Sequence, residues 1–354
     1  MEIAGRGSDA ARAAGWGLLT AGLVVLGIIL GSRGLKDFDT ALVPYAGATV
    51  FAAFGLGYRH AMWLRRPPTR LYWFRGWQLF FVPRRLPGNL ARLAERLWSN
   101  FAVQRFIFRR GALRWAAHWW IFWGCLLAAA VTFPLSFGWV RFETARDTQA
   151  VYQAFVFGVP VFRFPLDSIL APLVFQVLDL SAVMVLVGLG FALWRRARDR
   201  GALAVQQSSD LVPLVLLFTV CVTGLLLTIS THFVRGFHYE FLSQFHAVSV
   251  IFTLVYLPFG KFFHIFQRPA QLSISFYKDA GAAGPQAACA RCGQPFASAL
   301  HVGDLERVEE ALSIRFAAGQ AHYQEFCPPC RRKMLAITQD GIWRDGGRPR
   351  PERP

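Results

Sequence analysis

Long apolar runs alternate along this chain with shorter polar connections. One of six such runs, Leu211–Ser230, has twenty residues without a charge, which is the length needed to cross the roughly 30 Å hydrocarbon core of a bilayer as a helix. The runs are continuous, whereas the strands of a membrane barrel alternate apolar with polar positions. The pattern therefore predicts an all-α integral membrane protein. The six transmembrane helices are expected at Trp16–Gly31, Ala41–Leu64, Trp115–Val140, Ser168–Trp194, Leu211–Ser230 and Phe241–Phe266.

Composition and charge narrow the class of protein further. Of the 354 residues, 54% are hydrophobic and 17% are charged, against about 25% charged in ordinary soluble domains. The net charge of +17 would suggest nucleic acid in a soluble protein, but here the cations lie between the apolar runs. Segment 65–114 holds twelve arginines and one acid, Glu95. By the positive-inside rule we expect a multi-pass protein of the inner, cytoplasmic membrane, with both termini cytoplasmic and no nucleic-acid partner.

The connections also suggest how the chain is divided. Aromatic residues and leucines alternate with arginines in 65–114, which predicts amphipathic helices in the lipid headgroup plane. These helices would anchor the chain or present a platform to a cytoplasmic partner. The expected segments are two transmembrane helices in 1–64, the basic amphipathic cytoplasmic segment in 65–114, a four-helix core in 115–268, a linker in 269–287, a small cytoplasmic cysteine domain in 288–336 and a disordered tail in 337–354.

Histidines at membrane depth are the main candidates for chemistry, because an ionisable side chain is costly there. His246 and His264 are eighteen residues apart, or five full turns of an unbroken helix, so both would face one side about 27 Å apart. This places His246 near the outer surface and His264 near the cytoplasmic one. His118 opens the third helix, also at the cytoplasmic side. Together His118 and His264 suit the axial positions of a haem iron, whereas a single membrane histidine is more often explained by an interhelical hydrogen bond.

Three further histidines leave alternatives open. His60 ends the second helix and is a rival ligand at the cytoplasmic side, although an interfacial role is favoured there. His232 and His238 lie close to the outer surface. Either of them would partner His246, contact a quinone or simply face water.

Two stretches resemble a known family of membrane cytochromes. Residues 117–124 read A-H-W-W-I-F-W-G, and residues 257–266 read L-P-F-G-K-F-F-H-I-F. They resemble the early and the last haem-binding helices of the gamma subunit of respiratory nitrate reductase. Similar subunits belong to heterodisulfide-reductase-like, sulfite-reduction-associated and hydrogenase complexes. The resemblance covers roughly residues 115–269 and includes neither the first two helices nor the C-terminal domain.

The resemblance implies a four-helix cytochrome b core in 115–268, which makes the six predicted transmembrane helices a six-helix transmembrane haem-binding bundle. Such a core binds two b haems, exchanges electrons with quinone, and has a cytoplasmic iron–sulfur partner, often with a molybdopterin or other catalytic subunit behind it. By position, His118 and His264 match the ligands of the cytoplasmic-side haem, and His246 matches a ligand of the outer one. The family's second histidine on the early helix is replaced here by Ala128. The outer haem therefore takes an unusual partner, such as one of the two outer histidines, or is missing, which leaves one or two haems.

These expectations lead to a functional interpretation with rivals. The chain would be an electron-transfer subunit of a quinone-linked oxidoreductase complex, in which the direction of electron flow is open. Arg114 and Lys261 are expected near haem propionates at the cytoplasmic side, and a quinone is expected near His246 and the loop 155–164. The rivals are a haem-free membrane anchor, with the cysteine domain as a docking element, and a haem-free transporter. The sequence contains no internal repeat of the kind that transporters show.

The C-terminal domain carries a second candidate site. Four cysteines form two C-x-x-C pairs separated by thirty-four residues: Cys289, Cys292, Cys327 and Cys330. This pattern predicts a zinc-ribbon-like site of four thiolates, with zinc as the expected metal and rubredoxin-like iron as the alternative. A cytoplasmic location argues against disulfides. The two other cysteines, Cys125 and Cys221, stand alone in apolar runs and are interpreted as small buried hydrophobic residues.

Overall fold

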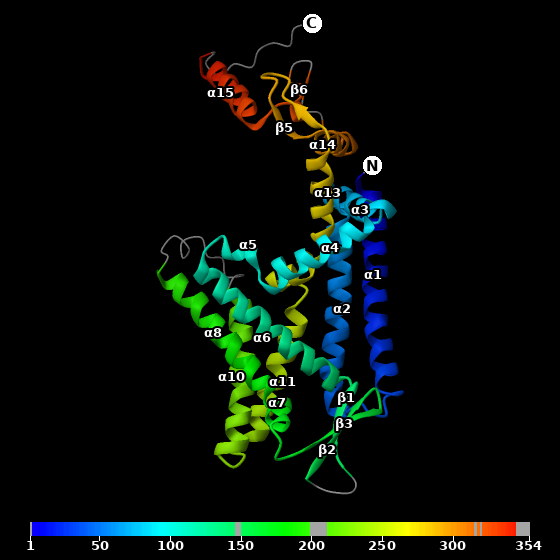
Figure 1. Cartoon of the computed structure of the whole chain (residues 1–354), viewed down its shortest axis with the longest axis vertical. Helices are drawn as coiled ribbons and strands as arrows, with labels where there is room; N and C mark the ends of the chain where they lie inside the picture. Colours follow the sequence, from blue (N-terminus) through cyan, green and yellow to red (C-terminus); the bar gives the residue numbers. More distant parts are fainter. Residues whose placement is uncertain (1, 146–149, 199–210, 315–316, 319–320, 345–354) are drawn as a thin grey trace. The chain divides into compact units, whose positions relative to one another are not determined.

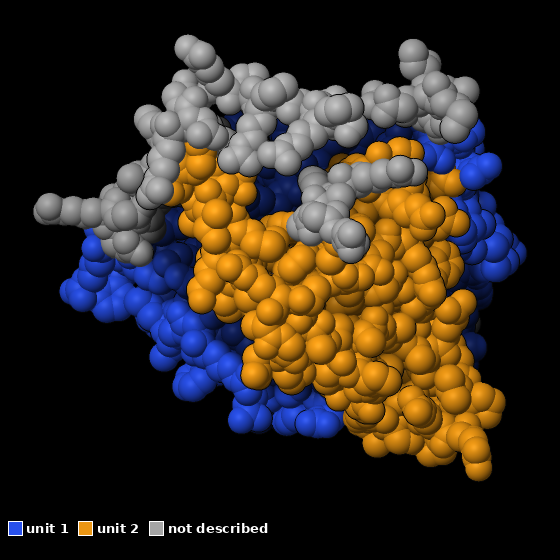
Figure 2. Space-filling view, turned by 90° about the horizontal axis from the view of Figure 1, so that it is seen from above, with its two compact units in different colours: residues 1–62, 94–268 blue, residues 63–93, 269–354 orange. Residues whose placement is uncertain are grey.

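The computed structural model describes residues 2–145, 150–198, 211–314, 317–318 and 321–344 (Figure 1). The chain is mostly helical and divides into two compact units, which are coloured separately in Figure 2. The first unit consists of residues 1–62 and 94–268, and the second unit consists of residues 63–93 and 269–354.

Long apolar helices make up most of the first unit. Among the described residues, five helices are long and apolar enough to cross a membrane, and there are six spans if one bent pair of helices counts as a single span. The five are α1 (Glu2–Gly31), α2 (Val43–Leu64), α6 (Ala112–Ser136), α8 (Val177–Arg198) and α10 (Val212–Phe233), and the bent pair is α11 (Tyr239–Tyr256) with η5 (Lys261–Phe263) and α12 (His264–Ala270). The prediction that the chain contains helices long and apolar enough to span a membrane is confirmed.

The sixth predicted span is not one continuous helix. The chain bends by 66° between α11 and α12. Pro258 explains the break, because proline has no backbone N–H to donate and its ring clashes with the preceding turn of a helix. Arg59 of α2 donates to the carbonyl oxygens of Pro258 at 2.5 Å and of Gly260 at 3.4 Å, so these carbonyl groups at the break are partnered. The prediction that His246 and His264 share one face of an unbroken helix is therefore wrong.

A three-stranded antiparallel sheet occupies the connection between α6 and α8. Its order is β1-β2-β3, with β1 at Val140–Thr144, β2 at Val151–Val156 and β3 at Val159–Pro165. Phe157 and Gly158 connect β2 to β3 with φ values of 50° and 79°, the positive values that a two-residue type I′ hairpin requires. Residues 155–164, expected as a loop, are thus a hairpin, and the all-α prediction is corrected to mostly helical.

The helices on either side of this sheet are shorter than predicted. Helix α6 ends at Ser136 instead of Val140, because the following residues enter β1. Helix α8 begins at Val177 instead of Ser168, and a separate short helix, α7 (Leu170–Phe175), precedes it. Both differences arise where the apolar pattern continues past the end of the regular helix.

Small residues allow α6 and α8 to pack closely. An added Cβ at Gly124 would lie 2.9 Å from the carbonyl oxygen of Ser181, and one at Gly188 would lie 2.7 Å from that of Ala117. Close backbone approach at small residues is a common way for helices to associate in a membrane. Val185, Leu189 and Cys221 form a buried apolar cluster beside this contact, which agrees with the interpretation of Cys221 as a buried hydrophobic residue.

The basic segment 65–114 is largely helical, as predicted. It contains α3 (Thr69–Phe80), η2 (Pro83–Arg85), α4 (Leu86–Arg96), the π-helical turn η3 (Leu97–Ala102) and α5 (Arg105–Phe108). Its position in the headgroup plane and its role toward a partner stay predictions.

Helices α3 and α13 (Leu272–Ala283) pack together in the second unit. An added Cβ at Gly76 would lie only 2.0 Å from the carbonyl oxygen of Ser273. The rings of Phe80 and Phe276 lie 4.8 Å apart, and both side chains are buried. Residues 269–287 were predicted as a linker, but they contain this packed helix because its apolar side chains find a partner surface on α3.

The remainder of the second unit surrounds the cysteines. It comprises β4 (Gln286–Ala288), β5 (Pro295–Ser298), α14 (Ala299–Ala311), β6 (Ala317–Ala318), β7 (Ala321–His322), η6 (Tyr323–Glu325) and α15 (Pro328–Arg344). Strand β4 pairs antiparallel with β5, and the Ser298 hydroxyl caps α14 by accepting from the N–H of His301 at 3.2 Å. Of the tail predicted to be disordered, residues 337–344 belong to α15, and residues 345–354 lie outside the described part of the chain.

Candidate functional site

Two histidine rings from different helices meet in the first unit. His118 lies in the second turn of α6, and His264 is the first residue of α12. Their ring centroids are 6.4 Å apart, and the ring planes are inclined by 63°. His118 is partly buried and His264 is exposed. The structure therefore brings together the two histidines that the sequence placed at one depth, even though the sixth span is broken.

Each of these rings has its Nδ1 atom engaged. Nδ1 of His118 lies 2.8 Å from Oε1 of Gln104, and Nδ1 of His264 lies 2.5 Å from the carbonyl oxygen of Lys261. Both partners are oxygen atoms that can only accept, so Nδ1 donates in each hydrogen bond, and Nε2 of a neutral ring then has the lone pair. A neutral imidazole of this kind binds a metal through Nε2, and the hydrogen bond at Nδ1 fixes its orientation.

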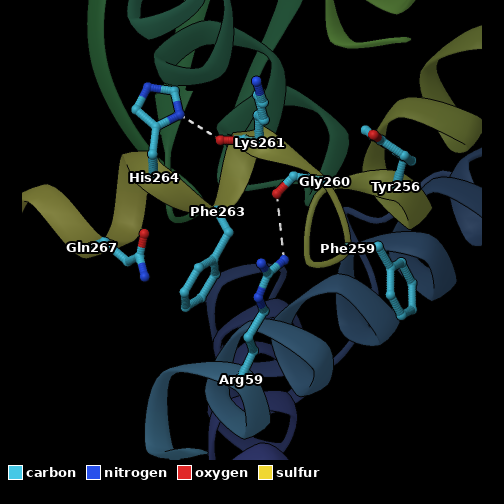
Figure 3. A pocket seen from close by; sticks show the side chains of 8 residues that line it. All are labelled: Arg59, Tyr256, Phe259, Gly260, Lys261, Phe263, His264 and Gln267. Carbon is cyan, nitrogen blue, oxygen red and sulfur yellow. Dashed lines mark hydrogen bonds between the residues drawn. The ribbon is translucent and has the colours of Figure 1, made fainter. Parts of the chain in front are cut away.

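A cavity of about 460 Å³ lies at the break in the sixth span, and His264 is part of its wall (Figure 3). Arg59 and Lys261 also line it, which makes the wall cationic. The Arg59 guanidinium lies 4.4 Å from the centroid of the Phe263 ring, in addition to its hydrogen bonds at the break. The wall of this pocket therefore combines two cationic side chains with one imidazole.

The separation of the two rings can be compared with that of two imidazoles that share one metal ion. Metal–imidazole bonds of about 2 Å would place the centroids of two ligating rings on the order of 6 Å apart, close to the observed 6.4 Å. Gln104 is only 2% exposed, and its Nε2 is buried without a hydrogen-bond partner among the described residues. This orphaned donor is available to a bound group that carries an acceptor. Arg114, one turn before His118 on α6, is exposed and is a further cation for carboxylates.

His246 also has a ring nitrogen engaged, but no second histidine ring is paired with it among the described residues. Its Nδ1 lies 2.8 Å from Oγ1 of Thr223, whose hydroxyl donates to the carbonyl oxygen of Thr219 at 2.7 Å. The Thr223 hydroxyl thus holds one ring nitrogen of His246 against α10. An added Cβ at Gly224 would lie 3.4 Å from Cε1 of His246, so a glycine leaves room beside the ring.

The two outer histidines do not meet His246 in the part of the chain that is described. His232 is exposed, and its Nδ1 lies 3.1 Å from the carbonyl oxygen of Thr228 in its own helix. His238 precedes α11 in a left-handed conformation with φ 53°. Eight residues separate His238 from His246, which amounts to about 12 Å of helix rise. A second ligand for an outer haem is thus not assembled by these side chains.

The four C-terminal cysteines come together in the second unit. Their sulfur atoms all lie within 4.8 Å of one another, and three of the four residues are buried. Cys289 follows β4, Cys330 lies in the first turn of α15, and the backbone N–H of Cys327 donates to the Cys289 sulfur at 3.3 Å. Gly293 follows the first pair with φ 70°, which allows a tight turn in which its N–H donates to the carbonyl oxygen of Cys289 at 2.8 Å. This cluster can bind a metal ion such as zinc, as its spacing predicted.

Two thiols of this cluster have pKa values that are shifted in opposite directions. Burial raises the pKa of Cys289, but hydrogen bonds from backbone N–H groups, chiefly that of Cys327, outweigh it and lower the pKa to about 6. The pKa of Cys330 is instead raised to about 12, first by its hydrogen bond with the Cys327 side chain and then by burial. Four thiols so close together cannot all ionise without a cation, and a bound metal supplies that cation.

Three supporting residues were missed by sequence reasoning. Gln104, Arg59 and Thr223 each contact the candidate site through the packing of separate elements, so no local spacing could reveal them. Comparisons of the chain with protein-family models, with curated proteins and with solved structures found no match.

Proposed function

We propose that this chain is the membrane-anchoring cytochrome b subunit of a respiratory oxidoreductase complex. In this proposal it transfers electrons between the quinone pool and a cytoplasmic iron–sulfur partner, with a molybdopterin or other catalytic subunit behind that partner. The observation that carries the proposal is the His118–His264 pair, whose rings stand 6.4 Å apart with both Nδ1 atoms engaged. Bis-histidine haem ligation needs two neutral imidazoles that each have a free Nε2, and the hydrogen bonds at the two Nδ1 atoms support this assignment.

In this proposal, different residues bind the haem, orient its ligands and supply positive charge. His118 and His264 would hold a b-type haem, which supplies one-electron transfer when bound. Gln104 and the Lys261 carbonyl would keep the rings oriented, while Arg59, Lys261 and Arg114 would offer positive charge to carboxylates. His246 would serve an outer haem or a quinone near the β2–β3 hairpin.

The cysteine cluster would have a structural role. Four thiolates form a closed tetrahedral set that suits zinc, with iron as the alternative. A closed site of this kind stabilises the local fold, so the second unit would offer a firm docking surface to the cytoplasmic partner.

A reduced-minus-oxidised absorption spectrum of the purified full-length chain tests the proposal. We expect a sharp b-type band with one or two haems per chain. His118→Ala and His264→Ala should each remove one haem, whereas His60→Ala, at the rival position, should leave the count unchanged. A colourless wild-type protein that keeps its cysteine-bound metal would refute the proposal and favour a haem-free anchor or transporter. Loss of haem in His60→Ala with retention in His118→Ala would overturn the ligand assignment.

A further inference from the structure

We infer that Gln104 is the positioning residue for His118. Its side-chain oxygen fixes the Nδ1–H tautomer and the ring orientation of His118, and thereby sets the reduction potential of an iron bound at Nε2. The first part of this inference concerns the protein alone. The last part rests on the proposed function, because it needs an iron at the site.

The two residues directly before Gln104 are fixed against α6 by hydrogen bonds. The indole N–H of Trp115 donates to the carbonyl oxygen of Val103 at 2.7 Å, and that of Trp123 donates to the carbonyl oxygen of Ala102 at 3.3 Å. Between these two anchors on α6 lies His118, whose Nδ1 is 2.8 Å from Gln104 Oε1. The π-helical turn at residues 97–102 ends two residues before Gln104, and such turns occur frequently at functional sites.

The backbone at Gln104 is unusual for a residue with a long side chain. Gln104 adopts the left-handed conformation, with φ 56° and ψ 41°, directly before α5. Glycine would take this conformation without a steric penalty, whereas other residues are disfavoured in it. The side chain is nevertheless 2% exposed and reaches His118. A glycine at this position would adopt the backbone conformation more easily, but it would lose the hydrogen bond to the ring.

An acceptor at Nδ1–H controls how strongly Nε2 donates electrons to a metal. A carboxylate acceptor makes the imidazole more basic and favours the ferric state, whereas loss of the acceptor makes it less basic and favours the ferrous state. The neutral amide of Gln104 lies between these two cases. Replacements of opposite character at this one position should therefore shift the haem potential in opposite directions, which a purely structural role would not produce.

Potentiometric titration of the full-length chain tests this. At a fixed ambient potential, we expect Gln104→Glu to raise the ferric-to-ferrous ratio about tenfold and Gln104→Leu to lower it by a similar factor, each equal to a shift of about 59 mV for a one-electron couple. Gln153→Glu is the matched control, because Gln153 is also buried but bonds Arg163 in the β2–β3 hairpin. It should leave the potential unchanged. Shifts in the same direction, or no shift, in the two Gln104 variants would overturn the inference.

A second measurement keeps the inference testable if the protein holds no haem. The ¹⁵N chemical shifts of His118 distinguish the Nδ1–H from the Nε2–H tautomer, and we expect only Nδ1–H in the haem-free wild type. Gln104→Gly removes the side chain and relieves the left-handed backbone, so it should fold normally and give a mixture of tautomers. A mixture already present in the wild type would overturn the positioning role. A single tautomer in a protein that binds no haem would support that role and refute the proposed function separately.

Discussion

Two neighbouring tyrosines in the second unit should respond in opposite ways to loss of their hydroxyl groups. Tyr72 of α3 and Tyr277 of α13 have ring centroids 5.0 Å apart. The Tyr277 side chain is 3% exposed, and its hydroxyl donates to Oδ2 of Asp304 at 2.8 Å. The Tyr72 hydroxyl is buried and has no hydrogen-bond partner among the described residues. Replacement by phenylalanine thus removes a hydrogen bond at one position and an unsatisfied polar group at the other.

The magnitudes follow from these contacts. A hydrogen bond to a charged acceptor contributes about 1.5–3 kcal/mol to stability, so Tyr277→Phe should lower the free energy of unfolding by about that amount. Asp304 keeps its ion pair with Arg75 at 2.6 Å, so the loss should not exceed this range. An unpartnered buried hydroxyl costs about 1–3 kcal/mol, so Tyr72→Phe should raise the free energy of unfolding by about 1 kcal/mol. The two variants should then differ by about 3 kcal/mol.

The same pair predicts alkaline sensitivity. Burial, with a smaller contribution from Asp304, raises the pKa of Tyr72 to about 12, and burial also raises the pKa of Tyr277. The unfolded chain releases the tyrosine proton near pH 10, before the folded protein does. The unfolded state then binds fewer protons, so stability should fall from about pH 10 to pH 12. Tyr72→Phe should make this decline less steep.

These effects are measured by urea unfolding of the full-length chain in detergent. The release of the cysteine-bound metal is the recorded signal. Titrations at pH 8 give the two free-energy changes, and titrations between pH 10 and pH 12 give the alkaline slope. Equal destabilisation by both substitutions would refute the assignment of an unsatisfied hydroxyl to Tyr72. An alkaline slope that is the same in wild type and Tyr72→Phe would refute the pKa argument.

Three further substitutions have clear expected outcomes. Gly76→Ala should destabilise the contact of α3 with α13 by about 1–3 kcal/mol, because the new Cβ overlaps a backbone carbonyl oxygen. Gly22→Ala is the control, because an added Cβ there meets nothing within 4 Å, and it should be neutral or stabilising in the same urea titration. Cys289→Ser should reduce the metal content measured by mass spectrometry at least tenfold, and Cys221→Ser should leave it unchanged, since Cys221 lies in the apolar cluster of the first unit. Arg59→Met should make amide hydrogen exchange faster at the break after α11, because two carbonyl groups lose their donor; unchanged protection there would refute the capping role.

Local sequence patterns predicted the parts of the fold that depend on few distant contacts. The apolar runs predicted the membrane-length helices, because a span needs only enough consecutive apolar residues. The two C-x-x-C pairs predicted the metal cluster, because each pair fixes two sulfur atoms at a short spacing. The β2–β3 hairpin was missed, since its apolar residues continue the pattern of the neighbouring helices.

The sequence by itself determined which side chains were available for chemistry: membrane histidines, basic connections and four thiols. Only the tertiary structure decided that His118 meets His264, that His246 instead faces Thr223, and that Gln104 orients a ring on another helix. These contacts join segments far apart in the chain, and they depend on how α6 packs and on where the chain turns after α11. A pattern of spacing describes one helix at a time, whereas the choice among several histidines is made by the packing of helices against each other.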